Sequence, residues 1–212
     1  MPSIALFQQH ASRNQTQAIA DVAPVKPQVS RAASTFTTEL IVYDTPVPFD
    51  TVIARLNVKV NKRGSSDIMG YLSKVTRQDQ FVALINEEAK NGFLYFTNYP
   101  HHRLMTFPDE KPKPRNELYV IGNPLFAQRI MTLNPAASQS VPLRLLVLEK
   151  PEGGAEVHFH VPSTILEIPR GLPRNAELTA LLARLDVLFE QMVQDITATG
   201  GPNDTPVAVV QQ

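Results

Sequence analysis

Two apolar segments joined by a short turn constrain the fold of this 212-residue chain more than any other feature. The segments are LRLLVLE at 143–149 and AEVHFHV at 155–161, both rich in the branched and aromatic side chains typical of strands. PEGG at 151–154 has the composition of a hairpin turn. Strands joined by so short a turn pair antiparallel, because a parallel pair needs a crossover of about a dozen residues. The hairpin therefore predicts an antiparallel or mixed sheet.

Apolar patterns elsewhere predict helices and further strands. Strands are expected at residues 39–43, 93–99 and 118–121, with another extended segment at 103–107 and a loop at 61–75. Helices are expected at 49–60, 76–89 and 126–133, and a long one from Asn175 to Gly200, where apolar residues follow one helical face from Leu178 to Ile196. This order predicts an α+β fold, with a curved, mostly antiparallel sheet and helices packed on one face.

Composition divides the chain into one domain and two tails. Residues 1–37 and 200–212 lack a sustained apolar pattern, so we expect them to be disordered and residues 38–199 to form one domain. The first segment is also poor in acidic residues, as mitochondrial transit peptides are. We expect a cytoplasmic protein, with a mitochondrial one as the alternative.

Charge and composition exclude several classes of protein. Lys plus Arg and Asp plus Glu each total 20, so no net field attracts nucleic acid or an anionic membrane. The chain has no cysteine, which excludes disulfides, thiolate metal sites and a cysteine nucleophile. No apolar run approaches the roughly 18 residues of a transmembrane helix. No nucleotide-binding glycine motif occurs, and we expect no cofactor.

Three segments carry a recognisable pattern: YVIGNPLFAQRIM at 119–131, VPLRLLVLE at 141–149 and VHFHVPS at 157–163. They resemble the domain-of-unknown-function 302 family, in particular its fungal branch. The resemblance covers roughly residues 39–168. It implies a fold similar to that of the TATA-binding protein, a curved antiparallel sheet with helices on one side. It implies no reaction and no catalytic residues, because a fold alone does not define a function.

Candidate catalytic residues follow from the absence of cysteine. His101 and His102 lie at a strand end, and adjacent residues there point to opposite sides, so one of them can face a pocket. Beside Tyr95 or Tyr99, such a histidine could act as a general acid or base.

Four further residues are candidates for ligand binding. They are Tyr99, Asn123, Met131 and Glu149. Asn123 also has a structural interpretation, in which Asn caps a helix that Pro124 begins. Glu149 has one as well, a surface ion pair at a strand end beside Lys150.

A metal site is a weaker hypothesis. His158 and His160 share one face of their strand with Glu156, because side chains alternate along a strand. Their spacing matches no metal motif, so the interpretation we favour is a solvent-facing hairpin and no bound metal.

These observations leave three functions open. The leading one is a small-molecule binding domain with an apolar pocket between sheet and helices. The alternatives are a cofactor-independent isomerase or cyclase that uses His, Tyr and Glu, and a structural homo-oligomer such as a homodimer.

Overall fold

The computed structural model describes residues 29–107, 111–167 and 175–200. Its contacts divide the chain into one unit that ends at Ala33 and a second that begins at Ser34. Of the first unit, residues 29–33 are described, and they carry no helix or strand. The predicted disordered tails and the transit peptide fall mostly outside the described residues. The helices and strands described belong to the second unit.

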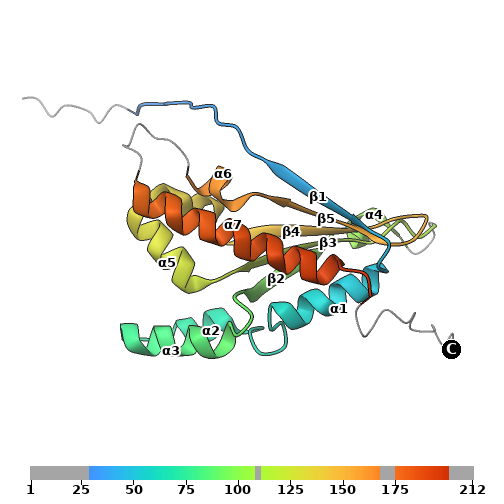
Figure 1. Cartoon of the computed structure of the whole chain (residues 1–212), viewed down its shortest axis with the longest axis horizontal. Coiled ribbons are helices and arrows are strands. Elements are labelled where there is room, and N and C mark those ends of the chain that lie inside the picture. Colours follow the sequence, from blue (N-terminus) through green and yellow to red (C-terminus); the bar gives the residue numbers. More distant parts are fainter. Residues whose placement is uncertain (1–28, 108–110, 168–174, 201–212) are drawn as a thin grey trace, which may run out of the picture. The chain divides into compact units, whose positions relative to one another are not determined.

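Five strands form one sheet in the order β1-β5-β4-β3-β2 (Figure 1). They are β1 (Leu40–Thr45), β2 (Leu94–Pro100), β3 (Asn116–Gly122), β4 (Leu143–Glu149) and β5 (Ala155–His160). All four neighbouring pairs are antiparallel, which confirms the predicted type of sheet. The first strand pairs with the last, so β1 and β2 form the two edges.

The turn between β4 and β5 is the predicted hairpin. Lys150 N donates to Gly154 O at 3.2 Å, and Gly153 N donates to Lys150 O at 3.0 Å. Gly153 and Gly154 have φ angles of +100° and +84°, a region that glycine enters without steric cost. The two glycines therefore close a turn that other residues would strain.

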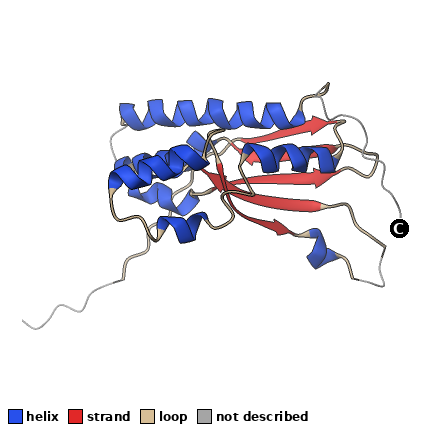
Figure 2. Ribbon diagram, turned by 90° about the horizontal axis from the view of Figure 1, so that it is seen from below, coloured by secondary structure: helices blue, strands red, loops and turns tan. Residues whose placement is uncertain are grey.

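The described ranges contain seven α-helices and one 3-10 helix. They are α1 (Phe49–Lys59), α2 (Ile68–Leu72), α3 (Gln78–Glu88), α4 (His102–Met105), α5 (Pro124–Leu133), η1 (Pro135–Ser140), α6 (Pro162–Leu166) and α7 (Ala176–Thr197). The Asn175 side chain caps α7 by accepting from Leu178 N at 3.0 Å, as predicted. Figure 2 shows α7 along one side of the strands and the short α4 on the opposite side.

The main core lies between the sheet and helices α1 and α7. On the three central strands, side chains that face these helices are buried, for example Tyr119, Leu145 and Val157, and those of the edge strands, such as Tyr43, are partly buried. Opposite them, Leu182 and Phe189 of α7 are also buried. We call this side of the sheet the inner face and the other side the outer face. This arrangement confirms the predicted α+β fold with helices packed on one face.

Two local predictions were wrong. The expected loop at 61–75 contains α2, and the expected extended segment at 103–107 contains α4. The short helices η1 and α6 were not predicted. A helix of four to six residues has too few internal hydrogen bonds to be stable by itself, so its stability comes from packing that a local pattern does not contain.

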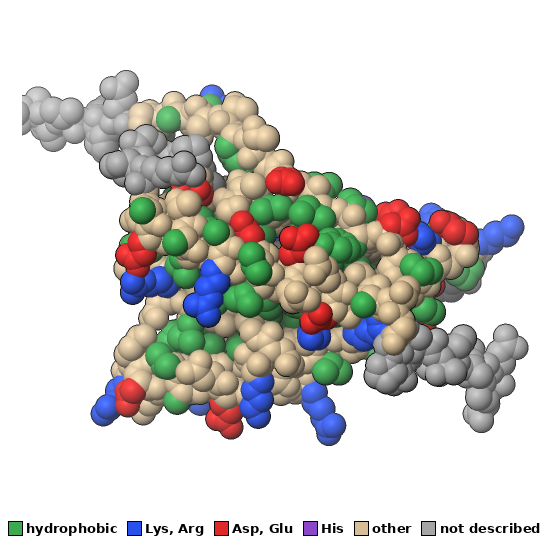
Figure 3. All heavy atoms as spheres, in the orientation of Figure 1, with side chains coloured by type: hydrophobic (Ala, Val, Ile, Leu, Met, Phe, Trp, Pro, Cys, Tyr) green, Lys and Arg blue, Asp and Glu red, His purple; other side chains and the backbone are tan. Residues whose placement is uncertain are grey.

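The helix-covered side of the domain carries charges of both signs. Figure 3 shows Lys and Arg interspersed with Asp and Glu over this side. Neither sign accumulates, in agreement with the zero net charge of the chain. Within the described ranges, no helix is both long and apolar enough to span a membrane.

Candidate ligand-binding site

The outer face of the sheet presents three rows of side chains that cross the strands. The middle row runs from β1 to β2 through residues that the strand register places side by side: Val42, His158, Leu146, Leu118 and Tyr99. Tyr99 and Val42, at its two ends, are 51% and 46% exposed. Four of the five side chains have apolar surface, although none belongs to the core between sheet and helices.

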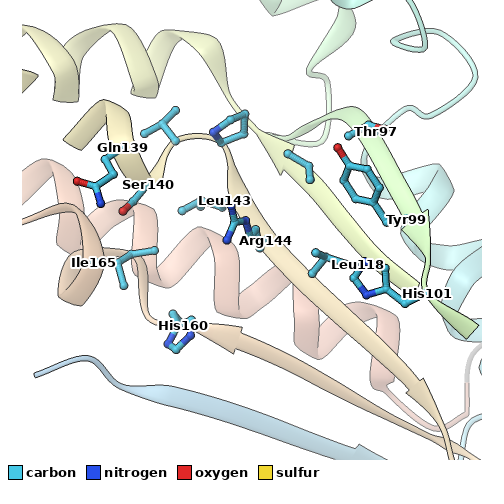
Figure 4. A pocket seen from close by; sticks show the side chains of 13 residues that line it. Thr97, Tyr99, His101, Leu118, Gln139, Ser140, Leu143, Arg144, His160 and Ile165 are labelled. Atoms are coloured by element: carbon cyan, nitrogen blue, oxygen red, sulfur yellow. The ribbon is translucent and has the colours of Figure 1, made fainter. Parts of the chain in front are cut away.

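A hollow of about 590 Å³ lies on this outer face, where η1 and α6 rise beside the sheet (Figure 4). Its size is within the range of about 300–1,000 Å³ that is typical of small-molecule sites. Strands β2 to β5 contribute Thr97, Tyr99, Leu118, Val120, Leu143, Arg144 and His160, and the adjoining segments contribute His101, Gln139, Ser140, Val141, Pro142 and Ile165. The site therefore combines residues from four strands and two short helices.

Both apolar and basic side chains line the hollow. Leu118, Val120 and Ile165 supply apolar surface, whereas Arg144 and two histidines supply donors of hydrogen bonds. None of the described residues that line the hollow is acidic. Arg144 is exposed and lies near the middle of the hollow in Figure 4, and the described chain gives it no ion-pair partner. Its guanidinium is therefore available to a ligand.

The two candidate histidines after β2 have different surroundings. His101 lines the hollow and stacks on Tyr99, with 6.1 Å between the ring centroids and 28° between their planes. His102 Nδ1 instead lies within hydrogen-bonding distance of the Asn116 backbone, 3.1 Å from its O and 3.3 Å from its N. His102 thus anchors α4 to the start of β3, while His101 is placed to meet a ligand.

Tyr95 does not join His101, contrary to the catalytic arrangement that the sequence suggested. A register shift between Tyr95 and Thr97 places Tyr95 on the inner face and Tyr99 on the outer face. There the Tyr95 hydroxyl donates to Asn98 Oδ1 at 2.7 Å, and Lys62 Nζ lies 4.9 Å from the centre of the Tyr95 ring. Burial raises the pKa of the Tyr95 hydroxyl. Of the two tyrosines that the sequence offered as a partner for a histidine, Tyr99 contacts His101 and Tyr95 lies on the other face.

The space between sheet and helices is small. A mainly apolar cavity there has a volume of only about 30 Å³ and is lined by Phe96, Gly122, Asn123, Pro124, Phe126, Ala127, Ile130, Val141, Pro142, Leu143, Leu166 and Leu185. This volume is about the share of one water molecule in the liquid. The predicted apolar pocket between sheet and helices corresponds in position to this small cavity, whereas the larger hollow lies on the outer face.

Asn123 and Met131 lie away from the hollow. Asn123 Oδ1 accepts from Leu125 N at 2.9 Å, and its Nδ2 donates to Gly92 O at 2.8 Å. The structural interpretation of Asn123 as the cap of α5 is confirmed, with Pro124 as the first helical residue. Met131 is a half-buried residue of α5 that lines neither of these two cavities.

The histidines of β5 face outward together with Glu156, as alternation predicted. His158 Nε2 lies 2.8 Å from Glu156 Oε2, and His160 Nδ1 lies 3.2 Å from Thr38 Oγ1. Only His160 of this group lines the hollow. The described residues contain no group of three or more His, Cys, Asp or Glu that could hold a metal ion.

Glu149 forms an ion pair at the strand end, but its partner is Arg115 rather than Lys150. Glu149 Oε2 accepts from Arg115 Nε at 3.1 Å and from Arg115 N at 2.9 Å, and Oε1 accepts from Nη2 at 2.8 Å. Arg115 also pairs with Asp50 and lies over the Phe49 ring at 4.4 Å. Lys150 pairs with Asp44 instead. Glu149 therefore ties β4 to the start of α1 and does not reach the hollow.

This ion pair makes the stability of the domain depend on pH. Hydrogen bonds from Arg115 lower the pKa of the Glu149 carboxyl. A carboxyl whose pKa is lower in the folded state stabilises the fold above its unfolded pKa, and this contribution is lost as the pH falls through the folded pKa. We expect Glu149→Gln to lower the free energy of unfolding by about 1–2 kcal/mol at pH 7. The charged hydrogen bonds to Arg115 are lost, but their partial exposure to water limits the effect.

Urea unfolding at pH 7 and at pH 3 measures this effect. The difference between wild type and Glu149→Gln should shrink at the lower pH, because there the carboxyl of the unfolded chain takes up a proton more readily than the native one. Glu152→Gln, at an exposed position of the hairpin turn, is the matched control and should change little at either pH. An equal loss in both variants would contradict the role of the Arg115 pair.

Sequence reasoning missed Arg144, although a signal for it exists. Arg144 is a charged residue within an apolar strand, LRLLVLE. Alternation places it on the face opposite Leu143 and Leu145, and therefore away from the core. The residues of η1 that complete the hollow carry no such signal.

An α+β domain with a five-stranded antiparallel sheet and helices on one face is the class of protein that this architecture defines. Residues 72–196, more than half of the chain, match the model of the family described as Domain of unknown function DUF302. The chain therefore belongs to the DUF302 family. This match does not distinguish the fungal branch from the rest of the family.

A solved structure supports the fold. The crystal structure of the uncharacterized conserved protein DUF302 from Bacillus stearothermophilus aligns with a TM-score of 0.51 and 12% sequence identity. The alignment covers 75% of this chain and 98% of that one. At this identity the likeness concerns the fold alone. No curated protein matches the chain significantly.

Proposed function

We propose that the protein binds a small molecule with an apolar body and an anionic group in the hollow on the outer face of its sheet. The observation that carries this proposal is the lining, which joins apolar side chains to Arg144 and two histidines without any described acidic residue. A guanidinium binds carboxylate, sulfonate and phosphate groups through paired hydrogen bonds. The apolar side chains would cover the rest of the ligand.

A pair of fluorescent probes tests the proposal. 1-Anilinonaphthalene-8-sulfonate and N-phenyl-1-naphthylamine share their ring systems, but only the first is an anion. We expect the anion to bind about ten-fold more tightly, which corresponds to about 1.4 kcal/mol for one charged hydrogen-bonding contact. Fluorescence titration at constant ionic strength measures both affinities.

Arg144→Gln should remove the preference for the anion while leaving the affinity for the neutral probe nearly unchanged. Arg184→Gln is the matched control, because Arg184 is an exposed arginine of α7 on the other side of the sheet. Equal affinities for both probes in the wild-type protein, or an unchanged preference in Arg144→Gln, would overturn the proposal.

One observation favours a second function, a cofactor-independent isomerase or cyclase. The stacked Tyr99 and His101 rings lie at the edge of the hollow, within reach of a bound molecule. If a ligand of the hollow is chemically converted, His101→Gln should abolish its turnover and leave its affinity within about three-fold, since proton transfer acts on the reaction rather than on binding. Turnover that persists in His101→Gln excludes this role.

A further inference from the structure

We propose that a second copy of this chain packs on the outer face of the sheet, so that the protein is a homodimer with two sheets face to face. The association uses the outer face that also holds the hollow, so Arg144 and Tyr99 belong both to the proposed ligand site and to this interface. Three properties of the outer face support it: an apolar middle row, a distribution of charge that is complementary to itself, and sufficient area.

The first property is the middle row. Its members at the sheet edges, Val42 and Tyr99, are about half exposed, and Leu146 and Leu118 between them are half-buried without packing against a helix. Antiparallel sheets that face water normally carry polar residues on that side. Apolar side chains in this position are typical of a surface that another sheet covers.

The second property is the position of the charges on either side of this row. Toward η1 and α6 the outer face carries the basic residues Arg144 and His160. Toward the hairpin it carries the acidic Glu156, together with Asp44, whose charge Lys150 balances. The register fixes these positions, since Glu156 and His160 lie on opposite sides of His158 on β5. One end of the face is thus the electrostatic complement of the other.

A two-fold axis that follows the middle row joins these complementary ends. Rotation about such an axis keeps each strand over its own copy and exchanges the two ends. Glu156 then lies over the partner's His160 and beside the partner's Arg144, because β4 and β5 are neighbours about 4.8 Å apart. Each contact occurs twice, as in every two-fold interface. The face is therefore complementary to itself in charge as well as in its apolar row.

The third property is area. The five strands are six or seven residues long. With strands about 4.8 Å apart and a rise of about 3.3 Å per residue, the face measures roughly 500 Å². Two such faces bury roughly 1,000 Å² together, the lower limit for a specific protein–protein interface. We therefore expect a reversible dimer rather than an obligate one.

Sedimentation equilibrium of the ligand-free full chain tests the proposal. The wild type should be dimeric at 100 µM, and Leu146→Glu should be monomeric, because the substitution places a carboxylate in the apolar row of each copy. Leu146 does not line the hollow, so this variant separates the dimer from the proposed ligand site. Val187→Glu is the control, because Val187 is an apolar residue of α7 whose side chain is 68% exposed. This variant should remain dimeric.

A charge exchange gives the decisive result. Arg144→Glu and Glu156→Arg should each weaken the dimer at least ten-fold, and the double variant should recover most of this loss, because the complementary pairs are restored in reverse. Thermal unfolding must show that every variant is folded, and Leu146→Gln replaces Leu146→Glu if the latter is not. A monomeric wild type, equal effects of Leu146→Glu and Val187→Glu, or no recovery in the double variant would overturn the proposal.

Discussion

Phe189→Ala should lower the free energy of unfolding by about 3–5 kcal/mol, one of the two largest effects that we expect from a single substitution. Phe189 lies in the middle of α7 and is 1% exposed. Its ring meets Phe93 edge to face at 5.4 Å and Phe159 at 5.1 Å. Alanine would remove both ring contacts and leave a cavity between α7 and the sheet, which the rigid strands cannot close.

Urea unfolding followed by circular dichroism measures this loss. Val187→Ala is the matched control, since Val187 lies two residues away on the exposed side of the same helix. It should change the stability by no more than about 0.5 kcal/mol. A loss below about 1.5 kcal/mol for Phe189→Ala would mean that the core repacks around the missing ring, contrary to a close-packed interior.

Gly154→Ala should have an effect of similar size for a different reason. The φ angle of Gly154 is +84°, and a Cβ atom there would lie 2.3 Å from Thr45 O and 3.1 Å from Pro46 Cα. Both obstacles are backbone atoms at the end of β1, so the hairpin must move away from that strand. We expect a loss of about 3–4 kcal/mol, of which about 1–2 kcal/mol is the cost of the left-handed conformation.

Gly153→Ala isolates the conformational part of this cost. Gly153 has a φ angle of +100°, but no atom lies within 4 Å of the position of its missing Cβ. Its replacement should cost only about 1–2 kcal/mol. Chemical unfolding measures the free energy of unfolding of both variants. Equal losses would show that the close approach to Thr45 O does not contribute to the cost in Gly154→Ala.

Those features of the fold that depend on neighbouring residues could be predicted. The stripe from Leu178 to Ile196 gave α7 within a few residues, because helical periodicity is a local property. Asn123 was recognised as a cap for the same reason. By contrast, α4 was predicted as extended, since its four residues have no periodicity to detect.

The candidate site was predicted only in part. Tyr99 and His101 meet as the sequence suggested, because they lie on one strand end. Tyr95 was misplaced because the register shift after it reverses the face of every following residue, and a simple alternation does not reveal such a shift. Glu149 was recognised as part of an ion pair, but its partner, Arg115, is 34 residues away in the chain.

The sequence by itself determined the hairpin, the long amphipathic helix and the α+β class of the fold, because turn composition and hydrophobic period act over a few residues. Only the tertiary structure decided that Arg144, Tyr99 and His160 surround one hollow on the outer face. Their meeting depends on the strand order, in which β4 lies beside β5 and β3 joins β4 to β2. Strand order results from packing between segments that are distant in the chain, so a local sequence pattern cannot predict it.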